Sequence, residues 1–191
     1  MIGLFFGSFN PVHIGHLVVA QHIYYEMGLE EVWFVVSPQN PFKTSASLVD
    51  KYERLHMVNL AIAECPYFKS SNLEFGLPEP SYTYDSLRAF KEAYPDKSFA
   101  MLIGSDGLQN LPRWKNGEDI LRNQKIIVYP RPGFPPEGKY FSSENIHISD
   151  APLIGVSATE IRKSIKNKTP KTFLLPKAVW EHIDQQILYT S

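Results

Sequence analysis

The feature that most constrains this sequence is an apolar run that stops abruptly at a turn near its start. Residues 2–6 are all apolar or glycine, and the run is too short for a helix, so it predicts a buried strand. Residues 7–11 combine glycine, asparagine and proline, which indicates a tight turn. From Ile14 the apolar spacing fits a helix that ends near Gly28. A strand, a turn and a helix start form an anion site, because free backbone N–H groups and the helix dipole converge there.

Two histidines lie at the predicted helix start. His13 and His16 are three residues apart, so on a first helical turn they would share one face and point at the bound anion. The alternative is an ordinary strand–turn–helix with two incidental surface histidines.

Composition sets the class of protein. The chain has 191 residues, 43% hydrophobic and 20% charged, with a formal net charge of −1. These values predict one globular domain over residues 1–191 and give no support to nucleic-acid binding, which needs a strongly basic face. Cys65 is the only cysteine, no apolar run approaches about 18 residues, and the start lacks a basic signal-peptide segment. We therefore expect a cytoplasmic protein with no membrane partner.

Strand-like and helix-like segments alternate along the chain. Strands are predicted at 32–37, within 68–75, and at 98–103, 125–129 and 146–148; helices are predicted at 50–64, from 81, from 157 and at 175–183. This order predicts an α/β fold: a Rossmann-like domain with a parallel sheet, helices on both faces and a ligand crevice at the switch point. In the helix at 50–64, Asp50 is the expected N-cap, and Arg54 and His56 are expected on the solvated side.

Polar residues follow several of these strands, where α/β sheets bind ligands. Lys43 lies in a proline-spaced loop after the second strand, Gly104 and Asp106 follow the strand at 98–103, and Arg131 follows the strand at 125–129. The alternative interpretations are that Lys43 is an ordinary surface residue, that Asp106 caps the next helix, and that Arg131 is solvated.

Two helix starts carry hydroxyl groups. Ser81 and Thr83 open one, and Ser157 with Glu160 forms a capping box at another. Capping and ligand binding are compatible, since a capped helix start still offers free amides to an anion. Trp114 is, by default, a core residue.

The ten-residue stretch Gly-Ser-Phe-Asn-Pro-Val-His-Ile-Gly-His resembles the signature of the His-x-Gly-His nucleotidyltransferases. Three further segments narrow the resemblance to the nicotinate mononucleotide adenylyltransferases: 81–87, the Gly104–Trp114 region and 155–162. The sequence departs from the family's motifs at three places. Phe6 stands where many relatives have glycine, the loop before residue 44 reads Asn-Pro-Phe-Lys, and Ala158 replaces a serine.

The resemblance implies transfer of the adenylyl group of ATP to nicotinate mononucleotide, with release of pyrophosphate, and a Mg²⁺ ion that arrives with ATP rather than in a protein cage. It implies catalytic roles for His13, His16, Lys43 and Arg162. ATP would contact Gly7, Ser8, Phe9, Asn10, Gly104, Asp106, Ser157, Thr159 and Arg162. Nicotinate mononucleotide would contact Lys43, Thr83, Tyr84, Trp114 and Arg131. The alternatives are another phosphate-bearing acceptor, such as nicotinamide mononucleotide or pantetheine phosphate, and a non-catalytic nucleotide-binding regulator. A homo-oligomer stays open.

Overall fold

The protein is built around a parallel β-sheet, seen in a computed structural model that describes residues 1–39, 48–137 and 139–190. Six strands in these residues pair in the order β3-β2-β1-β4-β5-β6, and every pair is parallel. The strands are β1 (Ile2–Gly7), β2 (Glu31–Val36), β3 (Phe68–Ser71), β4 (Phe99–Gly104), β5 (Lys125–Tyr129) and β6 (Ile146–Ile148). This is the strand order of a Rossmann fold.

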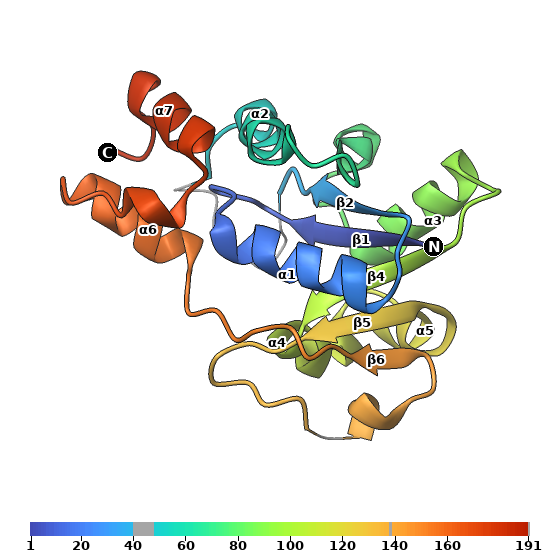
Figure 1. Ribbon diagram of the computed structural model, residues 1–191. Helices are drawn as coiled ribbons and strands as arrows, with labels where there is room; N and C mark the ends of the chain where they lie inside the picture. Colours follow the sequence, from blue (N-terminus) through green and yellow to red (C-terminus); the bar gives the residue numbers. More distant parts are fainter. Residues whose placement is uncertain (40–47, 138, 191) are drawn as a thin grey trace.

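Helices cover both faces of the sheet (Figure 1). One face carries α1 (Ile14–Glu26), α2 (Lys51–Ile62), α6 (Ala158–Lys166) and α7 (Lys177–Gln185). The other carries α3 (Thr83–Ala93), α4 (Ser105–Asn110) and α5 (Gly117–Asn123). Short 3₁₀ turns link them: η2 (Leu73–Gly76), η3 (Leu111–Arg113), η4 (Lys139–Ser142) and η5 (Thr172–Leu174). The predicted fold class is confirmed, while the extent of the domain stays a prediction.

The strand sequences explain the two cores. Side chains alternate between faces along a strand, so β1 sends Leu4 into one core and Phe5 into the other. The central strands are apolar on both sides because helices cover both faces, which is why they read as continuous apolar runs.

The strand order changes direction between β1 and β4. β2 lies on one side of β1 and β4 on the other, so the connections after β1 and β4 leave in opposite directions. A crevice forms at such a switch point, outside the carboxyl ends of the strands. Gly7 and Gly104 end these two strands, which places the predicted ligand residues that follow them side by side.

One expectation about α2 is wrong. Asp50 caps the helix as predicted, because its side chain accepts the N–H of Tyr52. Arg54, however, lies fully buried with no exposed surface, instead of on the solvated side. The reason is local: its guanidinium group donates to the carbonyl oxygens of Ser8, Ser37, Pro38 and Val49 at 2.7–2.8 Å. A helical wheel treats arginine as polar and cannot register backbone acceptors contributed by other segments.

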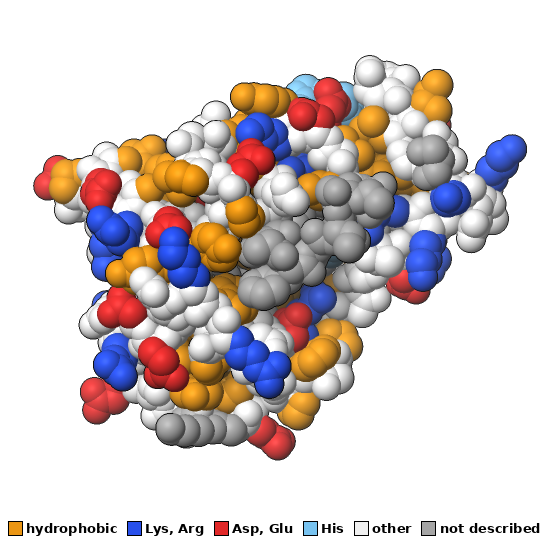
Figure 2. Space-filling model, turned by 180° about the vertical axis from the view of Figure 1, so that it is seen from behind, with side chains coloured by type: hydrophobic (Ala, Val, Ile, Leu, Met, Phe, Trp, Pro, Cys, Tyr) orange, Lys and Arg blue, Asp and Glu red, His pale blue; other side chains and the backbone are white. Residues whose placement is uncertain are grey.

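The surface agrees with the near-neutral composition. On the face shown in Figure 2, acidic and basic side chains are interspersed over the helices and loops. In the described residues, no helix is long and apolar enough to cross a membrane.

Lys43 lies outside the described residues.

Candidate functional site

The turn after β1 is held in an uncommon backbone conformation. Phe9 has a φ of 45°, in the left-handed region that disfavours side chains other than glycine, and the Asn10–Pro11 peptide bond is cis. The Phe9 ring is buried and packs against Phe5, Phe34 and His16, with ring centroids 5.1–5.8 Å apart. A side chain at Gly7 would stand 2.8 Å from this ring. The strain of the left-handed φ at Phe9 persists where the surroundings over-determine it, which is typical of functional turns.

Two arginines bind the backbone of this turn from different elements. Arg54 of α2 donates to the carbonyl of Ser8, and Arg162 of α6 donates to the carbonyl of Asn10, both at 2.7 Å. The Asn10 side-chain oxygen accepts the hydroxyl of Tyr189 at 2.8 Å and the N–H of Val49 at 3.3 Å. The turn therefore has a fixed shape before any ligand arrives.

The two histidines stack at the start of α1. His13 is the N-cap and His16 lies in the first turn, with ring centroids 3.8 Å apart. Gly15 allows this arrangement, since a Cβ there would stand 3.0 Å from Nδ1 of His13. The backbone N–H of His13 donates to Nδ1 of His16 at 3.2 Å. Nδ1 of His16 therefore acts as an acceptor, which in a neutral imidazole places the proton on Nε2.

His13 is held neutral by its surroundings. Burial, together with the positive charge of Arg131, lowers the pKa of His13 to about 4. Two buried side-chain atoms here, Nδ1 of His13 and Oγ of Ser8, have no hydrogen-bond partner among the described residues. Buried polar atoms are paired as a rule, so two such atoms on residues that line one cavity indicate a site that a polar ligand completes.

These residues line one cavity of about 580 Å³. One wall is the turn and helix start: Gly7, Ser8, Phe9, Asn10, His13 and His16. The opposite wall is the start of α6, with Ser157, Thr159 and Arg162, and Arg131 closes a third side. Ser157 caps α6 as predicted by accepting the N–H of Glu160. The structure thus brings most of the predicted ATP-contacting residues together.

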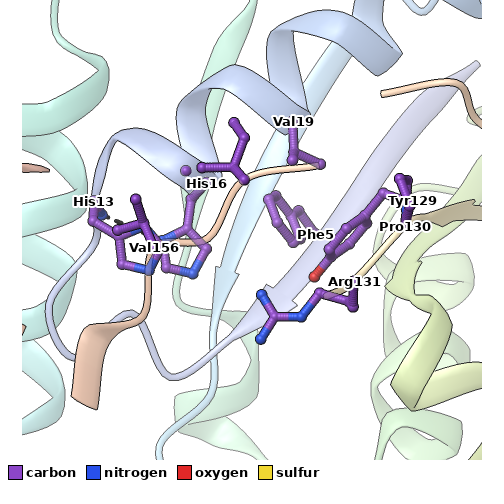
Figure 3. A pocket seen from close by; sticks show the side chains of 10 residues that line it. Phe5, His13, His16, Val19, Tyr129, Pro130, Arg131 and Val156 are labelled. Atoms are coloured by element: carbon purple, nitrogen blue, oxygen red, sulfur yellow. Dashed lines mark hydrogen bonds between the residues drawn. The ribbon is translucent and has the colours of Figure 1, made fainter. Parts of the chain in front are cut away.

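A narrow recess of about 20 Å³ opens beside the histidine rings (Figure 3). Its walls come from four segments: β1 with Phe5, the start of α1 with Val19, the end of β5 with Tyr129 and Pro130, and the segment before α6 with Ile154 and Val156. Arg131 extends from the end of β5 toward the histidine rings.

Arg131 is positioned by a buried serine. Oγ of Ser105, in the first turn of α4, accepts the N–H of Arg131 at 3.0 Å and donates to the carbonyl of Phe134 at 2.6 Å. Asp106 lies 3.7 Å from the Arg131 side chain, and a side chain on Gly104 would stand 2.9 Å from Cγ of Arg131. Gly104 and Asp106 therefore border Arg131 without lining the main cavity.

A second group of predicted residues lies on the other face of the sheet. Tyr84 and Trp114 pack against the core under α3 and α5, and Thr83 begins α3. None of the three lines the cavity that holds the histidines. Phe6 belongs to both regions, because it lines the cavity and also packs against the core that Tyr84 and Trp114 border. Arg131, predicted together with Thr83, Tyr84 and Trp114, is placed instead with the histidines.

Comparison with known proteins gives the family. Residues 4–164 match the family model described as "Cytidylyltransferase-like". The chain belongs to this family. Curated relatives in the family are similar over their full length. A protein of Flavobacterium psychrophilum named "Probable nicotinate-nucleotide adenylyltransferase" is 44% identical over 98% of both chains. One of Bacillus pumilus with the same name is 36% identical over 100% of this chain and 98% of its own.

Solved structures confirm the fold of this cytidylyltransferase-like chain. "Plasmodium falciparum nicotinic acid mononucleotide adenylyltransferase complexed with APC" superposes with a TM-score of 0.82, at 22% identity over 98% of this chain and 96% of the other. The same enzyme "complexed with NaAD" gives a TM-score of 0.82 at 23% identity, with the same coverage.

The described walls of the cavity do not form a complete set of ligands for a metal ion. Its described walls offer hydroxyl, imidazole and guanidinium groups and no carboxylate. Mg²⁺ prefers carboxylate, phosphate and water oxygens. The residues therefore fit a metal that arrives bound to a triphosphate, and they do not fit one held by the protein alone.

The sequence did not indicate the role of three residues that support the site: Arg54, Tyr189 and Glu74. Glu74 lies buried in η2 and accepts the hydroxyls of Ser81 at 3.0 Å and Ser86 at 2.5 Å, which fixes the start of α3. Its burial raises the pKa of this carboxyl. No local pattern marks these residues. Arg54 and Tyr189 act across contacts between distant segments, and Glu74 accepts from serines 7 and 12 residues further along the chain.

Proposed function

We propose that the protein transfers the adenylyl group of ATP to nicotinate mononucleotide, forming nicotinate adenine dinucleotide and pyrophosphate. The names of its full-length relatives support the reaction. The observation that carries the site assignment is the pair of orphan atoms at His13 and Ser8, in a cavity whose far wall is the cationic start of α6. A triphosphate is a ligand whose many oxygens match such a set of donors.

The two walls would divide the triphosphate between them. The turn after β1 and the start of α1 present backbone N–H groups and the positive end of the helix dipole. On the far wall, Arg162 is already oriented by Asn10 and by the Thr159 hydroxyl, 3.3 Å away. Thr159 and Ser157 would hold the terminal phosphates with it. Pre-orientation matters because donors fixed in advance need no reorganisation during the reaction.

The chemical step is a direct displacement. An oxygen of the acceptor phosphate forms a bond to the α-phosphorus of ATP, and the bond from that phosphorus to the bridging oxygen of pyrophosphate breaks. Negative charge grows on the leaving pyrophosphate and on the transferred group. The Nε2–H of His16 and the guanidinium group of Arg162 would stabilise this charge by donating to it. Nucleotidyl transfer of this kind depends on positioning and on charge neutralisation.

Magnesium would supply further neutralisation when it is bound to the triphosphate. In this proposal the protein itself contributes His13, His16 and Arg162, which bind and orient the triphosphate and donate hydrogen bonds to it. Phosphate oxygens and water would hold the cation, since the described walls of the cavity offer no carboxylate.

The acceptor would approach from the opposite side of the switch point. Thr83 and Tyr84 begin α3, whose free N–H groups favour a carboxylate, and the Trp114 indole face attracts a pyridinium cation. Phe6 stands between this group and the cavity, so it would separate the pyridine subsite from the triphosphate. Arg131 and Lys43 would then lie near the two phosphate groups that must meet. Gly104 and Asp106 would border the sugar of ATP.

The test is a coupled assay of pyrophosphate release with a panel of substrates. ATP and CTP are each combined with nicotinate mononucleotide, nicotinamide mononucleotide and pantetheine phosphate. We expect turnover with ATP and nicotinate mononucleotide, preferred over the amide by at least about tenfold in kcat/KM, because a carboxamide leaves one donor facing donors. Equal values for the two mononucleotides would contradict the acceptor assignment. Turnover with CTP alone would contradict the adenylyl assignment, and ATP binding without turnover would indicate a regulator.

We further propose a cytoplasmic location, which the single cysteine supports, since one cysteine forms no internal disulfide. Nucleic acid and membrane are not among the proposed partners, and a homo-oligomer is left open.

A further inference from the structure

A cluster of two histidines and two carboxylates lies away from the nucleotide cavity. His22 and Glu26 belong to the second half of α1, and His147 and Asp150 belong to β6 and the connection that leaves it. We call these four residues the α1–β6 cluster. Nε2 of His22 lies 2.5 Å from a carboxylate oxygen of Asp150, and Nε2 of His147 lies 2.9 Å from one of Glu26. None of the four lines the cavity described above.

Three of these side chains converge on one point. His22 and Glu26 are four residues apart and therefore share one face of α1, and Asp150 reaches the same face from the connection between β6 and α6. One ligand atom from each of the three lies within 4.8 Å of the other two. In a tetrahedral zinc site with bonds of about 2.0–2.2 Å, neighbouring ligand atoms lie about 3.3 Å apart. The separations from His22, 2.5 Å to Asp150 and 3.9 Å to Glu26, bracket that value.

The glutamate is already oriented by neighbours that would not bind the ion. The Ser149 hydroxyl donates to one oxygen of Glu26 at 2.5 Å, and His147 pairs with the other at 2.9 Å. The N–H of Asp150 also points to Glu26, at 3.4 Å. Metal-binding carboxylates are characteristically held by a second layer of hydrogen bonds of this type. Glu26 would therefore meet an ion with little rearrangement.

The donor set selects the kind of ion. One imidazole nitrogen with two carboxylate oxygens suits zinc and the neighbouring divalent transition metals, whereas magnesium and calcium prefer oxygen ligands throughout. Asp150 is 86% exposed at its side chain, which leaves a path for the ion to enter and a position for a bound water. We propose that His22, Glu26 and Asp150 form a binding site for one divalent transition-metal ion of the zinc class.

The site has a structural consequence. The connection from β6 to α6 runs past α1 (Figure 1), and it carries Ile154 and Val156 to the recess beside the histidines and Ser157 to the start of α6. An ion held by α1 and Asp150 would fix the first residues of this connection. The ion differs from the magnesium expected with ATP in its ligands and in its place in the fold.

The test uses zinc alone, titrated by calorimetry into chelator-treated protein without nucleotide. Because a lone thiol also binds zinc, every protein carries Cys65→Ser. We expect one zinc ion per chain and a rise in Tm with added zinc. His22→Ala and Asp150→Asn should each weaken binding at least about tenfold, and Ser149→Ala, which releases Glu26, should weaken it by about tenfold. Magnesium at the same concentration should produce no Tm rise.

The matched control is His56→Ala. His56 contacts His182, which pairs with Glu53 at 2.8 Å, so this second group also joins histidines and a carboxylate, on α2 and α7. Its variant should leave zinc binding unchanged. The absence of a saturable zinc site in the Cys65→Ser protein would overturn the proposal. A site unaffected by His22→Ala and Asp150→Asn, with both variants folded by circular dichroism, would overturn it as well.

Discussion

Replacing Arg54 with methionine should strongly destabilise the protein. The guanidinium group is fully buried and makes four hydrogen bonds to backbone carbonyls of three segments. Each hydrogen bond from a charged donor contributes about 1.5–3 kcal/mol, so four would give roughly 6–12 kcal/mol before the charge is desolvated. Burial lowers the pKa of Arg54, which shows that desolvation opposes this gain. Arg54→Met leaves four carbonyl oxygens without their donor, and an unsatisfied buried acceptor typically costs about 1–3 kcal/mol, so we expect a loss of roughly 4 kcal/mol or more.

Urea denaturation followed by circular dichroism measures this loss. A typical domain has only about 5–15 kcal/mol of stability, so Arg54→Met is expected to be folded but much less stable, or unfolded. Arg54→Lys keeps the charge but places three N–H donors on one atom, so it should fall between wild type and Arg54→Met. The control is Arg88→Met: Arg88 is exposed and pairs with Glu92 at 3.5 Å, a contact that contributes about 0–1 kcal/mol. If Arg54→Met stayed within about 1 kcal/mol of wild type, water would be satisfying the four carbonyls and the reasoning would fail.

Three further predictions concern the site. His16→Ala should fold normally and lower kcat by about 10²–10³, as loss of a charge-stabilising donor does, while the exposed His56→Ala should keep wild-type turnover; equal kcat values in a steady-state assay would make His16 structural. The pKa of His13, about 4 in the folded protein, lies below its unfolded value of 6.5, so the unfolded chain binds the proton first and stability is lost as pH falls from 6.5 to 4. This loss amounts to about 3 kcal/mol, and denaturation at several pH values should show a flatter profile for His13→Asn. Excess chelator should abolish turnover and leave the circular dichroism spectrum unchanged, and Mg²⁺ should restore turnover; if chelator unfolded the protein, the metal would be part of the fold.

The sequence predicts the sheet and the nucleotide turn well, because both depend on local patterns. β1 and β4 are short apolar runs that end at glycine, β2 is one that stops before Ser37, and His13 and His16 are joined by one helical turn. The conformation of these segments depends on a few neighbouring residues, so hydrophobic periodicity and turn-forming residues are sufficient to predict it.

The supporting residues could not be predicted in the same way. Arg54 was expected in solvent because three of its four acceptors, the carbonyls of Ser8, Ser37 and Pro38, follow β1 and β2 and lie 46, 17 and 16 residues away in the chain. Arg131 was predicted to contact the same ligand as Trp114, nicotinate mononucleotide, and its position with the histidines depends on Ser105 and on the pairing of β5 with β4. Such placements follow from tertiary contacts, which neither composition nor periodicity encodes.

The hydrogen bond between Tyr189 and Asn10 joins residues 179 positions apart and has a consequence for biosynthesis. Chains emerge from the ribosome N-terminus first, at about 5–20 residues per second, so Asn10 appears roughly 10–35 s before its partner. Contacts of such large separation also form late because a long loop must close first. Arg54, Val49 and Arg162 can therefore bind the nucleotide turn before Tyr189, whose hydrogen bond is the last of these contacts to become available.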